Sequence, residues 1–458
     1  MDTRPQPFLP PAPKPRTTPP SFLQMVRIVY RNPLELWGEP SYNEPVIHIR
    51  GGVGGPLLIV NDPALVRHVL VENARDFRMA RVRQKILRPI LRDGLLTAEG
   101  ETWKRGRKAM APVFTPRHIR GFAGPMLARA ERFAALYETR DGPFDMAHDM
   151  TQLTYEILAE TLFSNEIAGE PEQFGDRVER LLETMGRVDP LDLLAAPDWL
   201  PRITRLRGRK ALAFFRQIVR ETMDMRRKRL ERGEDAPEDF LTLLLKAEGP
   251  YGLTRDEVED NIITFIGAGH ETTARALGWT FYLLAHAPEQ RERIEEEVDR
   301  VTASVADPYD WLAAMPFTRA AFEEALRLYP PAPSINREAL QDFQWQGDTI
   351  RAGTQVLIMP WTLHRHRRLW DDPEAFMPER FWPGNREAID RFQYLPFGAG
   401  PRICIGAAFA LQEAVIALGV LMRRYRFAMA PGAPEPWPVQ KLTTQPEGGL
   451  RMVAVPRG

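Results

Sequence analysis

The chain has 458 residues, of which 44% are hydrophobic and 27% are charged. Lys and Arg together number 61, as do Asp and Glu, so the net charge is zero and no overall field draws the protein to nucleic acid or to an anionic membrane. A single cysteine, Cys404, excludes an internal disulfide and every metal site built from several thiolates. The length exceeds a usual domain of about 100 to 150 residues, so the chain forms either several domains or one large one.

Residues 1–40 are a proline-rich arm and lead-in, densest from Pro5 to Pro20, and this composition is typical of a polyproline-like segment on a protein surface. The segment lacks the apolar core of a signal peptide, and no stretch of about 18 apolar residues occurs in the chain. We therefore expect a soluble, cytoplasmic protein that does not span a membrane.

The first β-rich part covers about residues 41–62. The runs 46–49 and 57–60 flank a glycine-rich stretch and predict a hairpin. Because the glycines precede a strand and do not open a helix, they argue against a dinucleotide-binding loop. Further short β runs occur within 335–360, and a hairpin is expected near the C-terminus.

The middle of the chain has a helical pattern. Asp62 followed by Pro63 is typical of a helix N-terminus. Further helices are predicted over residues 102–110, 125–138, 151–163, 174–187, 208–232, 237–247, 254–287 and 406–425. With no repeat and no evident linker, the sequence predicts a mainly α fold with a small β-rich portion, forming one domain over residues 41–458.

Cys404 lies in the loop Phe397-Gly398-Ala399-Gly400-Pro401-Arg402-Ile403-Cys404-Ile405-Gly406, directly before the last predicted helix. Backbone N–H groups and the helix dipole favour a thiolate at a helix N-terminus. The glycines leave room for a flat group near the backbone, and Arg402 offers a forked donor for an anion. A lone cysteine is more often an inert core residue, so it is the whole pattern that indicates a cofactor held by one axial sulfur.

This loop resembles the haem-binding loop of the cytochrome P450 family, Phe-x-x-Gly-x-Arg-x-Cys-x-Gly, and matches every fixed position. The resemblance extends over about residues 45–455. It implies the cytochrome P450 fold, haem b (iron protoporphyrin IX) as the cofactor and Cys404 as the ligand of its iron. It also places Phe397, Gly398, Arg402 and Gly406 at the cofactor.

The longest predicted helix begins with a capping box from Thr254 to Glu257 and runs about 30 residues, which at 1.5 Å per residue is about 45 Å. Its middle reads Gly267-Ala268-Gly269-His270-Glu271-Thr272-Thr273. Glycines and a buried carboxylate there lower helix stability. The residues alone leave two interpretations: space for a ligand with an acid and an alcohol to relay protons, or a kink in which Thr272 bonds to a backbone carbonyl.

The same stretch resembles the family's oxygen-binding motif, Ala/Gly-Gly-x-Asp/Glu-Thr, which Ala268 begins and Thr272 ends. The resemblance implies that Thr272 stabilises the activated oxygen at the iron and that Glu271 helps to deliver protons for O–O cleavage. It places Ala268 against the haem. His270 fills the variable position and is expected to face away from the iron.

The haem propionates require cationic donors. Trp103 and Arg107 match the family's Trp-x-x-x-Arg, whose members bond to a propionate. Arg337 and Arg402 are the other partners that the resemblance implies.

A different set of charges is expected to support the fold behind the haem. Glu324 and Arg327, three residues apart on a helix, would alone be a routine ion pair. They match the family's Glu-x-x-Arg, which joins a later arginine, here Arg380.

Lys104, Arg105 and Lys108 add to Arg107 in a dense basic patch. Such a patch is either a solvated helix face or a dock for an acidic electron carrier. Only about fifty residues follow Cys404, so we expect no fused flavin domain. The resemblance then implies that electrons come from a separate ferredoxin or flavodoxin and its reductase, docking near Lys104, Arg105 and Lys108.

These implications predict a monooxygenase that activates O2 and inserts one oxygen atom into a hydrophobic small molecule, either fatty-acid-like or terpenoid. The expected pocket lining comprises a loop over residues 77–96, the segments 181–215, 265–268 and 332–336, and the turn near Thr443. Two rivals remain. A haem-thiolate peroxygenase would use hydrogen peroxide but usually lacks the acid-alcohol pair, and a non-catalytic haem sensor or carrier would need neither that pair nor a redox dock.

Overall fold

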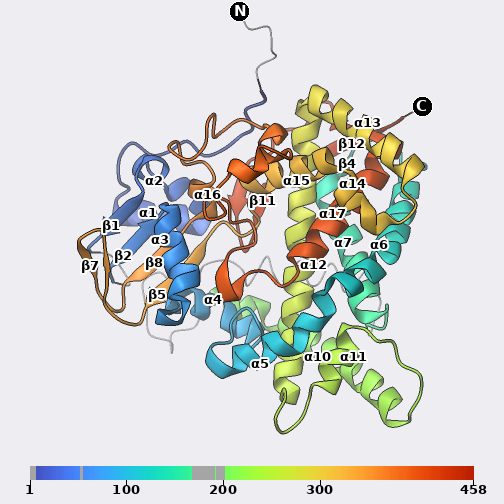
Figure 1. Ribbon diagram of the computed structural model, residues 1–458, viewed down its shortest axis with the longest axis horizontal. Coiled ribbons are helices and arrows are strands. Elements are labelled where there is room, and N and C mark those ends of the chain that lie inside the picture. The colour runs from blue at the N-terminus through green and yellow to red at the C-terminus, as the bar shows by residue number, and fades with distance from the viewer. Residues whose placement is uncertain (1–6, 52–54, 168–190, 192–201, 458) are drawn as a thin grey trace, which may run out of the picture.

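The computed structural model describes residues 7–51, 55–167, 191 and 202–457 (Figure 1). The helix predicted over 174–187 lies outside the described residues. Within them the chain is mainly helical with small β-sheets, as the sequence predicts. No described helix combines the length and the apolar character that crossing a membrane requires.

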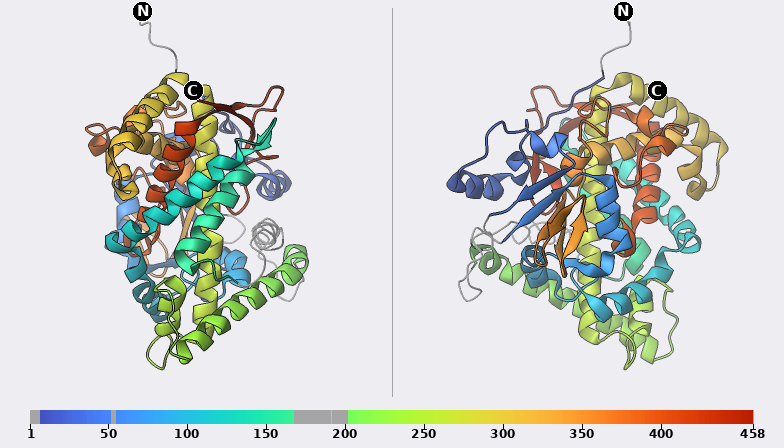
Figure 2. Two further views of the ribbon diagram at one scale, coloured as in Figure 1. Left: turned by 90° about the vertical axis from the view of Figure 1, so that its right-hand side faces the viewer. Right: turned by 60° about the vertical axis from the view of Figure 1, so that its left-hand side comes forward.

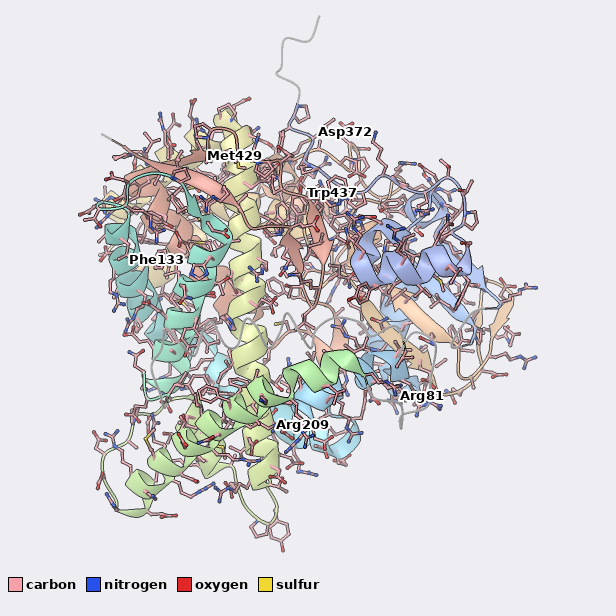
Figure 3. All side chains as sticks on the ribbon, turned by 180° about the vertical axis from the view of Figure 1, so that it is seen from behind. Arg81, Phe133, Arg209, Asp372, Met429 and Trp437 are labelled. Carbon is pink, nitrogen blue, oxygen red and sulfur yellow. The ribbon has the colours of Figure 1, made fainter. Side chains whose placement is uncertain are left out.

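One helix, α12 (Arg255–His286), passes through the middle of the molecule, and the other helices gather around it (Figures 1 and 2). The capping box predicted at its start is present, because the Thr254 hydroxyl accepts from the Glu257 N–H while Glu257 accepts from the Thr254 N–H. Seen from behind, α10 (Ile203–Glu231), which carries Arg209, crosses the lower part of α12 (Figure 3).

The helices packed on α12 form most of the hydrophobic core. They include α4 (Arg81–Leu91), α7 (Met146–Phe163), α11 (Phe240–Lys246), α13 (Pro288–Ser304), α15 (Pro316–Leu328) and α17 (Ala407–Arg424). Further out lie α1 (Phe22–Arg31), α2 (Pro40–Asn43), α3 (Pro63–Arg67), α5 (Gly100–Met110), α6 (Pro116–Leu136), α14 (Trp311–Ala314) and α16 (Pro360–Leu363).

The β-rich part lies to one side of the helices in Figure 1. Its five-stranded sheet has the order β1-β2-β8-β5-β3, built from β1 (Val46–Ile49), β2 (Leu57–Val60), β8 (Gln355–Ile358), β5 (Ile335–Ala339) and β3 (Phe77–Met79). The predicted hairpin is β1 and β2, which pair antiparallel with Val46 opposite Val60. The sheet therefore joins strands from the first part of the chain to strands from 335–358, and β2 pairs with β8 in parallel.

Three smaller sheets complete the β structure. They are β6 (Phe343–Trp345) with β7 (Asp348–Ile350), β4 (Phe144–Asp145) with β12 (Arg451–Pro456) and β9 (Tyr425–Met429), and β10 (Pro438–Gln440) with β11 (Thr444–Pro446). The expected C-terminal hairpin corresponds to β10 and β11, which pair antiparallel. Its turn reaches α12, and this contact matters for the site.

Several helix predictions need correction, and α1 and α13 were not predicted. α6 begins at Pro116 and not at 125, because Pro116 occupies the first turn while Pro125 lies inside the helix. α4 was not predicted, because no side chain caps its start at Ala80 and Pro89 lies within it.

The proline-rich arm packs on the body, whereas its composition suggested a segment lying loosely on the surface. The ring of Phe8 stacks on His286 at the end of α12, with 4.7 Å between ring centroids. The Phe8 carbonyl accepts a hydrogen bond from the Phe376 N–H, and the Tyr329 hydroxyl donates to the Pro11 carbonyl. Pro10 and Pro13 are buried.

The predicted supporting charges come together in the core. Arg327 donates to Glu324 at 2.7 Å, and both side chains are fully buried. The Arg380 Nε atom lies 3.4 Å from the same carboxylate. This cluster joins α15 to the loop that begins at Pro378.

Candidate cofactor and active site

The loop before α17 has a fixed shape that presents Cys404. The Cys404 N–H donates to the Phe397 carbonyl at 2.9 Å, which closes the loop on itself. Gly400 has φ of +72°, and a Cβ atom there would overlap the carbonyl oxygen of Leu70. Only glycine satisfies both constraints.

The Cys404 thiol faces a space inside the protein. The residue is exposed, yet burial raises the pKa of its thiol, opposed by the Gly406 backbone and the Arg107 charge. An exposed side chain that is still desolvated must border an internal space lined by protein. In such a space a thiolate requires a cationic partner, and an iron ion supplies one.

The middle of α12 borders a space too. Gly267, Ala268, Gly269 and Thr272 have accessible surface, whereas most of the surrounding helix is buried. Ala268 and Thr272 are four residues apart and therefore share one face. In Figure 1 the start of α17 lies beside the middle of α12, and the two helices are in contact.

Thr272 also makes the bond of the kink interpretation, since its hydroxyl donates to the Ala268 carbonyl at 2.9 Å. This bond agrees with the second interpretation left open by the sequence and does not exclude the first. The hydroxyl still has acceptor capacity on the accessible face of the helix.

Glu271 and His270 point away from that face. The Thr443 hydroxyl donates to Glu271 Oε1 at 2.7 Å, and the Arg275 guanidinium lies 3.9 Å from the same oxygen. His270 is buried, its Nδ1–H donates to the Ile266 carbonyl at 2.6 Å, and burial lowers its pKa to about 4. His270 is therefore neutral and turned from the space, as expected.

The cationic side chains predicted around the cofactor gather near Arg402 and Ile403, directly before Cys404 in its loop. Arg402 donates to the Ala98 carbonyl at 2.7 Å and to Glu99 at 2.6 Å, and its guanidinium lies 4.9 Å from the centre of the Trp103 ring. Arg107 donates to the Ile403 carbonyl at 2.8 Å.

Arg337 extends this group. Burial and the positive charge of Arg402 lower the pKa of Arg337 to about 10, and Arg83 acts in the same direction. Arg83, on α4, was not identified from the sequence. Burial lowers its pKa, and no described residue accepts a hydrogen bond from it.

Three guanidinium groups, of Arg83, Arg337 and Arg402, are thus related here to one carboxylate: Glu99 accepts from Arg402 and acts on Arg337, while Arg83 acts on Arg337. They leave two positive charges unbalanced in a desolvated region, which is unfavourable unless two negative charges enter. The two propionates of a haem carry that charge, so the residues present fit the group.

The basic patch on α5 is smaller than the sequence suggests. Lys104 pairs with Glu101 at 2.6 Å and Arg105 with the buried Glu257 at 2.7 Å. Lys108 is exposed, and no ion pair joins it to another described residue.

Parts of the predicted pocket lining can be located. Phe265 on α12 contacts Phe114 and Phe240 through its ring, at centroid distances of 5.5 and 4.4 Å. Thr443 is buried and is bonded to Glu271, so it does not line an open pocket. Of the predicted segment 181–215, residues 181–190 and 192–201 lie outside the described part of the chain.

Comparison with known proteins gives a consistent result. Residues 42–452 match the family model described as cytochrome P450. Cyclooctatin synthase of Streptomyces melanosporofaciens is 32% identical over 437 residues, covering 94% of this chain and 93% of that protein. The cyclooctat-9-en-7-ol 5-monooxygenase of the same organism is 32% identical over 415 residues, covering 88% and 87%. A crystal structure of the cytochrome P450DA haem domain superposes with a TM-score of 0.78 at 28% identity, covering 91% and 90% of the two chains.

Proposed function

This chain belongs to the cytochrome P450 family of haem-dependent monooxygenases, and from that premise we propose how its own residues divide the work. Cys404 is the ligand of the haem iron, and Thr272 and Glu271 are the catalytic residues. The observation that carries this assignment is the desolvated yet accessible Cys404 thiol.

The cofactor is haem, which when bound activates O2 and inserts one oxygen atom into a hydrophobic substrate. Its propionates are held by Arg337, Arg402, Arg107 and the Trp103 indole N–H, and we add Arg83 to this set because its guanidinium lacks a partner among the described residues. Phe397, Gly398, Gly406 and Ala268 line the faces of the ring, where side chains must be flat or small.

The protein's part in the reaction is to position protons and exclude water. Thr272 presents its hydroxyl on the accessible face of α12 and anchors it to the Ala268 carbonyl. Glu271, buried next to it in sequence, holds a carboxylate that can exchange protons. Buried side chains around them keep bulk water from this part of the helix, which makes each remaining polar group more effective.

For the substrate we propose a hydrophobic, ring-containing compound, terpenoid-like more than fatty-acid-like. The support is the relative named as a monooxygenase of cyclooctat-9-en-7-ol, together with the aromatic contacts of Phe265. We further propose a cytoplasmic enzyme that receives electrons from a separate ferredoxin or flavodoxin with its reductase, docking on α5 around Lys108, with Lys104 and Arg105 at the edge.

The spectrum of the reduced, CO-bound protein tests the assignment. The wild type should show the strongly red-shifted Soret band of a thiolate ligand, and Cys404→Ser should lose that band while retaining the fold by circular dichroism. A Cys404→Ser protein that keeps the band would refute Cys404 as the ligand. A screen of terpenoids and fatty acids for the low-to-high-spin shift of the ferric protein then tests the substrate class.

A further inference from the structure

The carboxylate of Glu271 is held by a part of the chain that the oxygen-binding motif does not include. Thr443 lies in the turn between β10 and β11, and its hydroxyl donates to Glu271 Oε1 at 2.7 Å. Both residues are buried, at 4% and 6% exposure. Losing a hydrogen bond between two buried polar groups is costly, so this contact matters for where the carboxyl group rests.

The turn that carries Thr443 is itself fixed on both sides. Asn32 donates to the Pro438 carbonyl and accepts from the Gln440 N–H, which ties β10 to the start of the chain. Thr444 donates through its hydroxyl to the Pro330 carbonyl at 2.7 Å. The Thr443 hydroxyl is therefore presented by a rigid support.

Helix geometry shows what this bond does to the motif. Successive side chains on a helix point about 100° apart, so Glu271 and Thr272 cannot face the same way. Glu271 faces the β10–β11 turn, whereas Thr272 shares the accessible face with Ala268. To pass a proton to the side of the helix that carries Thr272, the Glu271 carboxyl group has two routes. It either breaks its bond to Thr443 and rotates, or transfers the proton while that bond is kept.

We propose that Thr443 is a positioning residue for Glu271: its hydroxyl sets where the carboxylate rests and how readily it turns toward Thr272. Arg275 supports the same position from α12, at 3.9 Å from Oε1. This inference rests on the proposed function of Glu271 in proton delivery. It assigns a role to a turn that lies 172 residues from the motif in sequence.

The experiment compares three variants of the full-length haem protein. Thr443→Val removes the hydroxyl and keeps the shape, Thr443→Ser keeps the hydroxyl, and Thr444→Val is the matched control, because it removes a buried hydroxyl from the same turn that bonds to a backbone carbonyl. For each variant we would measure the share of reducing equivalents lost to peroxide with a fixed substrate and reconstituted electron donors, and the melting temperature.

We expect Thr443→Val to increase the peroxide share severalfold, up to about tenfold, which is the size of one hydrogen bond to a charged group. Thr443→Ser should restore the wild-type share, and Thr444→Val should leave it unchanged. When Glu271 is already Gln, adding Thr443→Val should not change the peroxide share further. It should also lower the melting temperature less than it does in the wild type, because the effects of two residues in contact are not additive.

Two outcomes would overturn the inference. One is an equal rise in peroxide from Thr443→Val and Thr444→Val, which would show a general loosening of the turn. The other is additive behaviour of Thr443→Val and Glu271→Gln in both measurements. These failures are distinct from failure of the proposed function, in which the wild-type protein would lack the red-shifted CO band.

Discussion

Glu413, on α17 nine residues after Cys404, is a buried carboxyl group that the proposed reaction does not use. Neither of its oxygens has a hydrogen-bond partner among the described residues, and its side chain is only 1% exposed. Burial raises its pKa well above the usual value of 4.5, and the nearby Thr273 hydroxyl acts in the opposite direction. Burial therefore favours the protonated form of this group in the folded protein.

This state predicts a pH dependence of stability. The folded protein binds the Glu413 proton more tightly than the unfolded chain does. The contribution of this group to the free energy of unfolding is therefore largest below the ordinary carboxyl pKa, and it declines as pH rises toward the pKa in the folded state. Glu413→Gln keeps a neutral side chain of similar shape and removes this decline. Melting temperatures measured from pH 5 to pH 8 should diverge in favour of Glu413→Gln as pH rises; parallel curves for the two proteins would contradict a raised pKa.

At the residue scale, the sequence predicts site residues where the chemistry is local. Cys404 and its glycines stand within ten residues, as do Ala268, Glu271 and Thr272. Sequence reasoning missed Arg83 because no motif contains it and a basic residue on a helix usually faces solvent. It could not find the Thr443 bond to Glu271, since nothing in either segment encodes a contact between residues so far apart.

At the scale of elements, the Cys404 loop depends on a close approach to the segment His68–Glu72, which continues α3. Gly400 combines a positive φ with the contact to the Leu70 carbonyl. Backbone atoms cannot move aside as the end of a side chain can, so a larger residue there must displace the loop.

We therefore predict that Gly400→Ala prevents stable haem incorporation and lowers stability by about 3 kcal/mol or more, the sum of an unfavourable backbone conformation and overpacking. Gly353→Ala is the matched control, because Gly353 also has a positive φ but has open space around its Cα. It should lower stability by only about 1 kcal/mol and leave the haem content unchanged. Haem-to-protein absorbance ratios and urea unfolding measure both effects, and equal losses in the two variants would argue against the packing explanation.

Two helix predictions succeeded where the ends carry signals, although α1, whose start has a capping box of Ser21 and Gln24, was missed. The capping box at Thr254 located the start of α12, and Asp62 before Pro63 located α3. They failed at α4, whose start has no capping side chain, and at α6, where an internal proline was interpreted as a first-turn proline. Tertiary packing supplies the stability that these local signals do not.

At the scale of the whole molecule, a net charge of zero means that the proposed docking of an acidic electron carrier would depend on local charges. On α5, Lys104 and Arg105 are already paired, so Lys108 is the cation with the most charge to offer to a partner. Because the protein has no net charge, the rest of its surface would repel an acidic electron carrier little as the carrier approaches Lys108.

Lys108→Glu should slow reduction by an acidic ferredoxin severalfold at low salt, with the difference shrinking as ionic strength rises, because exposed charges are screened beyond about 8 Å at 0.15 M. Arg300→Glu on α13, at the opposite end in Figure 1, makes the same change in net charge away from α5. Stopped-flow reduction rates compare the two. If Arg300→Glu slows reduction as much as Lys108→Glu, net charge and not docking on α5 is the cause.

The arm that stacks Phe8 on His286 has a consequence for how the protein is made. Pro11 bonds to Tyr329, 318 residues later, so an arm that leaves the ribosome early must wait for most of the chain before it finds its place. Its many prolines hold it extended in the meantime and keep it from forming competing helices. The contact of Pro11 with Tyr329 can thus form only after residue 329 has been synthesised.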